Sequence, residues 1–390
     1  MSSAGKHVKE VRKRRGLTQR GLADASGVSL SIIRKLEQGE RETARLETLR
    51  KLAVALRVPT MRLAGGPNGE GPRPGAEEQW KALRAALEQP PLTLGSDDDQ
   101  PTVAGVGDAL RATEPLFQKD EFAKLANVMP PLLRDAEALG DDGRGIRFQL
   151  LQLSGWLMVQ TRQFNAAEVA LRRAMDDATD RLEGAATMNT WCWLLLRQGD
   201  LGKAYDLAVR WADETEPRIT RASPEELSTW GIMLLRVSGA AIRNSQQGAA
   251  QDALRFANSA AAALGREYVP RSAYLVGMRN FGPTRVKLQA AENASVMDQP
   301  DLVLRLSQKI SARSQASNNR NRHFLDVADA YAKTGHYSEA FGKLAQIREC
   351  SPEWLPNQRY ARDIFGKIVK GRRTLTDEMR EMADLVGLPL

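Results

Sequence analysis

The feature that most constrains the fold is an internal repeat in the long C-terminal part of the chain. From about residue 102 onward apolar residues recur at helical spacing, and no useful length alternates as a strand would. Five apolar residues, called anchors below, share one spacing pattern: a small residue lies twelve positions before each, and an apolar residue lies seven positions after each. The anchors are Ala167, Ala204, Ala253, Val303 and Ala340. Small residues let helices cross closely in pairs that then stack, so the pattern predicts an all-α solenoid.

Glycines mark where the paired helices should turn. Gly199, Gly248 and Gly335 each lie five residues before an anchor. The pattern resembles tetratricopeptide repeats, although its anchors are 37, 49, 50 and 37 residues apart, whereas such repeats have a constant length of about 34. The alternative is an irregular helical bundle. The segments 117–139 and 355–388 are predicted to be helices that flank the array.

Glycine and proline indicate the domain boundary. Eight of the eleven residues from 65 to 75 are Gly or Pro, which neither helix nor strand tolerates. Residues 1–64 are therefore predicted to form a small domain, and residues 102–390 the helical repeat domain. Residues 65–101 are predicted to be a linker that contains a short helix with Trp80, Leu83 and Leu87 on one face.

The positive charge of the chain is concentrated at its beginning. Residues 1–64 hold 15 Lys and Arg against 6 Asp and Glu, whereas the other 326 residues hold 41 against 42. A basic segment is typical of proteins that bind nucleic acid, because Lys and Arg neutralise phosphates and release counterions. The alternative is an ordinary solvated basic surface.

The residue pattern inside this basic segment favours nucleic-acid binding over an ordinary solvated surface. An apolar helical pattern begins the chain and stops at Gly16. Thr18 and Ser29 are placed to cap a second and a third helix, and Gly39 ends the third. Leucines at helical spacing over residues 46–56 predict a fourth helix.

This segment resembles the Xre/Cro type of helix-turn-helix domain found in phage repressors and bacterial regulators. The resemblance covers about residues 6–64. It rests on Gly16-Leu17-Thr18-Gln19, Leu22-Ala23, Gly27-Val28-Ser29, Ile33, Leu36-Glu37, Gly39 and Leu49-x-x-Leu52-Ala53-x-x-Leu56. It implies that the third helix enters the major groove of DNA while the second crosses the phosphate backbone. It also implies an internal ion pair between Arg12 and Glu37.

The resemblance assigns two kinds of DNA contact. Ser29, Leu30, Ser31 and Lys35 would face base edges, where Lys35 reaches guanine and Leu30 packs on a thymine methyl group. Phosphate contacts, which fix the register without reading sequence, would come from Gln19, Arg34 and Arg41. The family usually has a polar residue where Leu30 stands, so the resemblance does not supply an operator sequence.

The whole arrangement resembles actinobacterial regulators that join an Xre-type domain to a tetratricopeptide-like sensor. More distantly, it resembles the peptide-responsive quorum-sensing regulators of Gram-positive bacteria. The C-terminal motifs Phe281-Gly282-Pro283-Thr284 and Arg320-Asn321-Arg322-His323-x-x-Asp326 carry this resemblance. It implies a transcription regulator that binds double-stranded operator DNA and an effector, either a peptide or a small molecule. A homodimer is expected, because one such domain covers too few base pairs for useful specificity.

The effector is expected on the concave face, which the first helix of each pair lines. The inward positions predict Gln149, Gln152, Trp156, Asn189, Trp193, Arg197, Arg285 and Arg322 as effector-binding residues. Arg285 and Arg322 share one repeat position and can clamp a carboxylate or a phosphate. The alternative is that both tryptophans belong to the core and that both arginines pair with neighbouring acidic residues.

Catalysis has little support in the sequence. Three histidines and two cysteines, all scattered, predict no metal site, and no phosphate-binding glycine loop or nucleophile elbow suggests a cofactor or an enzyme. The charged N-terminus has no signal peptide pattern, so a cytoplasmic protein is expected. The alternative function is a DNA-tethered scaffold whose repeats dock a partner protein without a small ligand.

Overall fold

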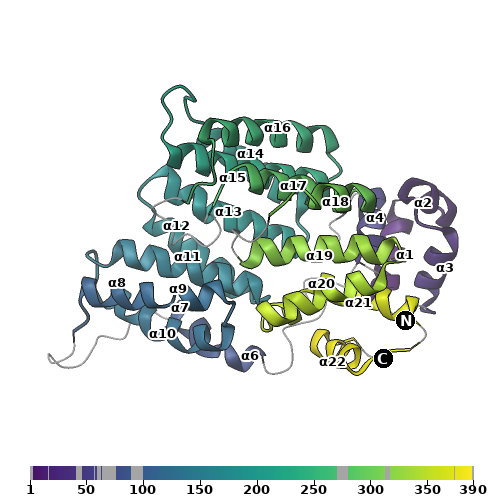
Figure 1. The fold of residues 1–390 in the computed structure, drawn as a ribbon, viewed down its shortest axis with the longest axis horizontal. Coiled ribbons are helices and arrows are strands. Elements are labelled where there is room, and N and C mark those ends of the chain that lie inside the picture. The colour runs from purple at the N-terminus through teal and green to yellow at the C-terminus, as the bar shows by residue number, and fades with distance from the viewer. Residues whose placement is uncertain are drawn as a thin grey trace.

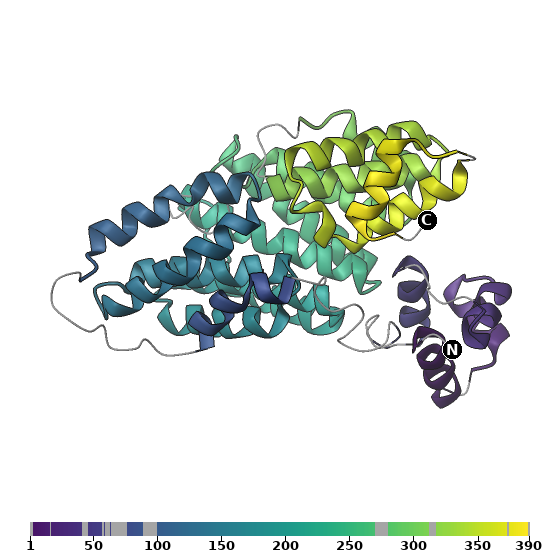
Figure 2. The same ribbon diagram turned by 90° about the horizontal axis from the view of Figure 1, so that it is seen from below.

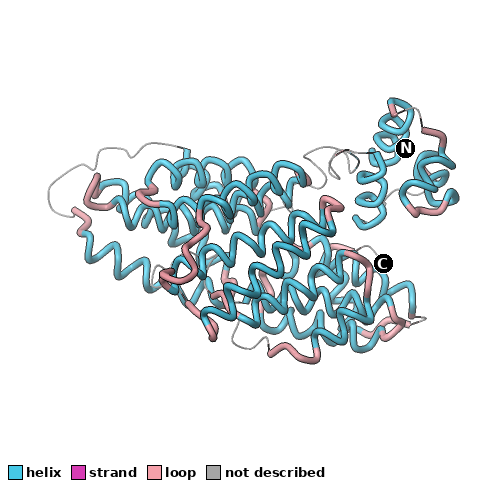
Figure 3. The backbone as a smooth tube through the Cα atoms, turned by 90° about the horizontal axis from the view of Figure 1, so that it is seen from above, coloured by secondary structure: helices cyan, strands magenta, loops and turns pink. Residues whose placement is uncertain are grey.

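The computed structural model describes residues 3–15, 17–40, 46–56, 58, 63, 76–88, 100–269, 280–311, 317–372 and 374–388. These residues are almost entirely helices and turns, with a single β-bridge between Tyr268 and Phe281 (Figures 1 and 3). The predicted all-α fold, a small domain followed by many stacked helices, is confirmed. None of the described helices is long and apolar enough to cross a membrane.

The N-terminal domain packs its helices around a core of its own. Its helices are α1 (Ser3–Arg14), α2 (Gln19–Ser26), α3 (Leu30–Gln38) and α4 (Leu46–Leu56). The predicted caps are confirmed: Thr18 Oγ1 accepts the Gly21 amide at 2.9 Å, and Ser29 Oγ accepts the Ile32 amide at 3.4 Å. Gly39 ends α3 with a left-handed φ of +81°. The buried core includes Val8, Val11, Leu22, Ile33, Leu36, Leu49, Leu52 and Leu56.

Five consecutive helix pairs follow in the described residues. They are α11 (Arg144–Gln160) with α12 (Phe164–Asp177), α13 (Arg181–Gln198) with α14 (Leu201–Glu214), α15 (Pro224–Arg243) with α16 (Gln247–Leu264), α17 (Pro283–Val296) with α18 (Pro300–Ser307), and α19 (Ser317–Lys333) with α20 (Tyr337–Cys350). The small residues predicted at the helix crossings are buried. At Gly155 an added Cβ atom would lie 2.6 Å from the side chain of Leu171, so α11 and α12 cross too closely for a larger residue unless Leu171 moves.

The third pair differs from its expected register by three residues. The expected turn at Gly248 is wrong, because Gly248 lies inside α16, and the turn residue with left-handed φ is Ser245. In the other pairs the left-handed residue stands five positions before the anchor, at Arg162, Gly199, Asp298 and Gly335. The anchor of the third pair is therefore Ala250 rather than Ala253. Its small partner is Ser238, whose hydroxyl donates to the Ala250 carbonyl at 2.8 Å.

Further helices flank both ends of the five pairs. Before the pairs lie α6 (Ala76–Gln79), α7 (Lys81–Glu88), α8 (Val103–Ala112), α9 (Glu114–Gln118) and α10 (Phe122–Ala138). After them lie the 3-10 helix η3 (Leu355–Asn357), α21 (Arg359–Gly371) and α22 (Asp377–Val386). The short helix predicted within the linker buries Trp80, Leu83 and Leu87 in the core of the repeat domain, with α7 against α10 and α12. It therefore belongs to that domain rather than to a linker.

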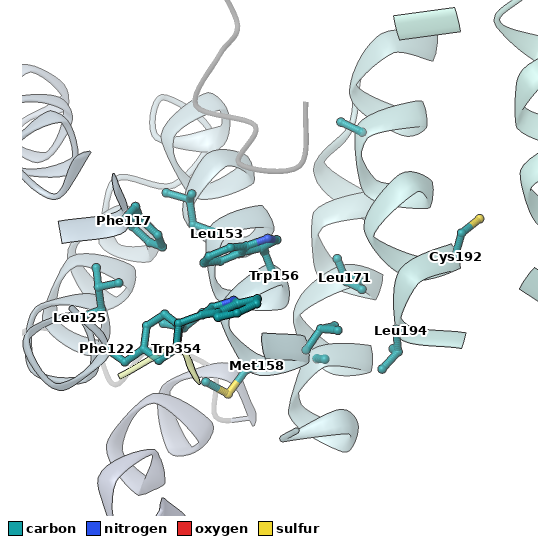
Figure 4. Close-up of a cluster of buried hydrophobic side chains, with 14 of the residues drawn as sticks. Phe117, Phe122, Leu125, Leu153, Trp156, Met158, Leu171, Cys192, Leu194 and Trp354 are labelled. Carbon is teal, nitrogen blue, oxygen red and sulfur yellow. The ribbon is translucent and has the colours of Figure 1, made fainter. Parts of the chain in front are cut away.

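The C-terminal segment after α20 returns to the first helix pairs. Trp354 is buried beside Trp156 and Phe122, as Figure 4 shows. Its indole Nε1 donates to Gln160 Oε1 at 3.2 Å. On the other side of Gln160, the amide nitrogen donates to Asn318 of α19 at 2.8 Å. The last pair is thereby joined to the first by hydrogen bonds through Gln160.

The N-terminal domain lies beside the end of α17 and the start of α18 (Figures 1 and 2). Arg50 of α4 donates to the carbonyl oxygen of Val296 at 2.5 Å. Lys51 lies 3.7 Å from the carboxylate of Asp298, the left-handed residue of the fourth pair. Within the described residues, these contacts join the small domain to the turn between α17 and α18.

Candidate functional site

The first candidate site is the outer face of α3. The helix buries Ile33, Leu36 and Glu37 against the rest of the small domain. Its opposite face leaves Ser31, Arg34, Lys35 and the cap residue Ser29 exposed, with Leu30 half-buried. The residues predicted to contact DNA on this helix therefore share a single accessible surface. Arg41, also predicted, lies outside the described residues.

A buried ion pair fixes α3 against the first helix. Arg12 Nε lies 2.7 Å from Glu37 Oε1, and its Nη2 donates to Oε2 at 2.8 Å, so the predicted pair is confirmed as bidentate. Gln19 Nε2 donates to the same carboxylate at 2.8 Å. Burial raises the pKa of Glu37, but the hydrogen bonds from Arg12 and Gln19 outweigh it and hold the pKa below its usual value. The structure thus places the predicted phosphate contact Gln19 in an internal network.

The second candidate site is a cavity of about 350 Å³ on the concave side of the helix pairs. Six of the predicted effector residues line it, namely Trp156, Asn189, Trp193, Arg197, Arg285 and Arg322. Gln149 and Gln152 do not line it, and Gln152 instead donates to Thr187 inside the helix stack. Trp156 contributes mainly to the core, where its ring lies edge-on to Phe117 at 6.0 Å.

Two arginines of the third pair were missed by sequence reasoning. Arg236 and Arg243 both line the cavity from α15. The expected register of this pair lies three residues too late. With Ala250 as the anchor, Arg243 occupies the same repeat position as Arg197, seven residues before the anchor. Gly248 lies five residues before Ala253 and so imitates a turn glycine, whereas the left-handed turn lies at Ser245.

Two acidic residues of the cavity wall are engaged by cations. Glu292 pairs with Arg243 and lies 4.0 Å from Arg322, whose guanidinium also stacks over the Tyr360 ring at 5.1 Å. Asp329 pairs with Lys333 at 2.8 Å and with Lys367 at 2.5 Å. The negative charges of Glu292 and Asp329 are therefore neutralised within the protein.

The same cavity holds arginines whose hydrogen-bond partners are neutral. Arg197 Nη1 donates to Gln358 Oε1 at 3.0 Å, and Arg236 Nε donates to Asn189 Oδ1 at 3.0 Å. Burial lowers the pKa of Arg197 to about 9, and the nearby charges of Arg162 and Arg322 add to this effect. Burial likewise lowers the pKa of Arg285 to about 10. The arrangement can bind an anion.

The cavity and the small domain meet at the α17–α18 turn. Arg50 of α4 lines the cavity together with Val296, whose carbonyl oxygen it contacts. Asp298 lies between Lys51 of the small domain and Lys333 of the cavity wall, at 3.7 and 2.5 Å. A ligand that moves Lys333 would therefore also alter the contact between the two domains.

Comparisons with known proteins concern the N-terminal domain. A helix-turn-helix family model matches residues 8–63. A stretch of 59 residues is 44% identical to the Uncharacterized HTH-type transcriptional regulator RghRB of Bacillus subtilis (strain 168), covering 15% of this chain and 42% of that protein. A stretch of the same length is 41% identical to the HTH-type transcriptional repressor RghR of that organism, covering 15% of this chain and 44% of that protein.

The chain thus spans less than half the length of these curated relatives. No solved structure matches the chain. The family match ends at Leu63, so the likeness of the helix pairs to tetratricopeptide repeats stays a prediction. Residues 8–63 are a helix-turn-helix domain of the Xre type, similar to those of Bacillus transcription regulators.

Proposed function

We propose that the protein is a cytoplasmic transcription regulator, not an enzyme, that binds double-stranded operator DNA as a homodimer under the control of an effector. The observation that carries the proposal is the exposed polar face of α3 in a helix-turn-helix domain. Such a helix enters the major groove with its N-terminal residues toward the bases. Ser29, Ser31 and Lys35 are then the base contacts, and Arg34 binds phosphate.

The homodimer follows from the size of the DNA-binding surface. One recognition helix reads only a few base pairs, whereas two helices related by a two-fold axis read half-sites about 34 Å apart. The repeat domain would supply most of the dimer contacts. Light scattering with bound DNA tests this, because a strictly monomeric protein with full operator affinity would refute it.

Effector control is supported by the contact between the cavity and the small domain. Lys51, Asp298 and Lys333 connect α4 to the cavity wall. A ligand bound there would shift this contact and change the spacing of the two recognition helices. Effectors typically change affinity by about 5–150-fold. Linkage requires that operator DNA change the effector affinity by the same factor.

Selection of genomic DNA fragments by the purified full-length protein tests the proposal. Repeated selection should enrich one shared sequence arranged as an inverted repeat. Arg34→Ala should weaken binding to all sequences alike and flatten the salt dependence. Recovery of no common sequence would defeat the DNA-binding assignment. Operator binding with a stable protein partner, and with no response to any ligand, would instead favour the scaffold function.

A further inference from the structure

Arginines outnumber carboxylates in the wall of the cavity. Within the described residues, Arg197, Arg236 and Arg285 have no ion pair, and Arg285 has no hydrogen bond through its Nε. Unpaired buried charge is unfavourable unless a partner neutralises it. The carboxylates of the wall do not provide that partner within the described residues, since none of them forms an ion pair with these three arginines. A ligand with several negative charges would complete the site.

A polar donor in the same wall also lacks a partner. Asn189 is fully buried and lines the cavity; its Oδ1 accepts from Arg236, but its Nδ2 has no hydrogen-bond partner. A buried donor is almost always satisfied, so an orphaned one on a cavity wall indicates a missing acceptor. The ligand should therefore bring acceptor oxygens as well as charge.

The size of the cavity favours a compact ligand. A volume of about 350 Å³ is near the lower end of the range of about 300–1,000 Å³ for small-molecule sites.

We infer that the effector is a compact organic phosphate with at least two negative charges, bound by Arg197, Arg236 and Arg285. The inference rests on the proposed function and names the chemistry of its effector. Guanidinium groups bind phosphate oxygens through paired hydrogen bonds, and a phosphate concentrates two charges and several acceptors at one centre. A single carboxylate would leave most of the arginine charge unmatched.

Titration calorimetry of the full-length protein with pyrophosphate tests the inference. We expect one binding site per chain and tighter binding than for glutarate, a dicarboxylate of lower charge at neutral pH. The double variant Arg236→Gln with Arg285→Gln should weaken pyrophosphate binding at least tenfold. The control Arg210→Gln, on the exposed face of α14, should bind as the wild type does.

Several outcomes would overturn the inference. They are no pyrophosphate binding by the wild type, tighter binding of glutarate, or binding that survives the double variant. If the double variant fails to fold, Asn189→Ala provides the second test and should weaken pyrophosphate binding while glutarate binding changes less. Operator binding is measured separately, so a wrong ligand class and a failure of DNA binding are distinguishable.

Discussion

The two regions of the molecule both use cationic side chains, but they place them differently. In the N-terminal domain, Arg34 and Lys35 lie exposed on the outside of α3. In the repeat domain, Arg197, Arg236 and Arg285 line an internal cavity. The charge balance along the sequence reveals only the first group, because residues 65–390 are nearly neutral in sum. Net charge thus indicates a basic surface but not a basic interior.

The N-terminal domain also contains a buried arginine, and this one has a carboxylate partner. Arg12 is paired with Glu37, so Arg12→Met leaves a buried carboxylate without its partner. We expect the variant to lose about 3–5 kcal/mol from the stability of the small domain. Chemical unfolding followed by circular dichroism measures the loss. The double variant Arg12→Met with Glu37→Leu should recover much of it, and a single variant as stable as the wild type would contradict the assigned role of the pair.

A pH dependence is expected from His323 beside the cavity arginines. Burial, and secondarily Lys343, lower the pKa of His323 to about 4. The unfolded chain, with a pKa near 6.5, then binds more protons between these values, so stability is present above about pH 6.5 and falls as pH drops toward 4. The shift corresponds to about 3 kcal/mol at most. The free energy of unfolding at pH 7.5 and at pH 5 measures this contribution. The difference between the two values should be smaller in His323→Gln.

The exposed face of α3 should respond in its DNA affinity rather than in its stability. Lys35→Ala removes a base contact and should reduce binding of the selected sequence by about 1–3 kcal/mol. Unrelated DNA should be affected much less. Fluorescence anisotropy with both duplexes measures the two effects. Equal losses on both would show that Lys35 binds phosphate instead of a base.

Removing an arginine without an ion pair from the cavity should slightly raise the stability of the ligand-free protein. Arg285→Met replaces a desolvated charge that has no carboxylate partner, so the ligand-free protein should gain about 1 kcal/mol. Thermal unfolding without added anions measures the gain. The exposed control Arg210→Met should leave stability unchanged. A clear loss in Arg285→Met would mean that Arg285 stabilises the wall of the cavity.

Short sequence motifs were sufficient to predict much of the fold. The caps at Thr18 and Ser29 and the pair Arg12–Glu37 are fixed by short motifs with defined spacing. The paired helices are visible because small residues recur at each crossing. The register of the third pair was predicted wrongly, because Gly248 lies five residues before Ala253 as a turn glycine would, whereas the left-handed turn is at Ser245.

Contacts between distant segments could not be read from the sequence. Trp354 bonds to Gln160, 194 residues earlier, and Arg50 bonds to Val296, 246 residues later. Neither contact belongs to a repeat or a local motif, so no periodic pattern in the sequence predicts it. Trp354, Arg50 and Val296 all line the cavity. The sequence therefore suggested a ligand surface that includes Arg197 and Arg285, but it did not reveal Arg236 or the shape of the cavity.

One set of DNA titrations tests most directly whether α3 binds the operator while the cavity arginines do not contribute to operator affinity. Anisotropy is measured with the selected duplex for the wild type, for Lys35→Ala, and for Arg236→Gln with Arg285→Gln, all without added anions. We expect Lys35→Ala to bind about 5–150-fold more weakly, the equivalent of 1–3 kcal/mol. The cavity variant should bind within about twofold of the wild type. A folded cavity variant that loses as much operator affinity as Lys35→Ala would show that the two regions do not have separate roles.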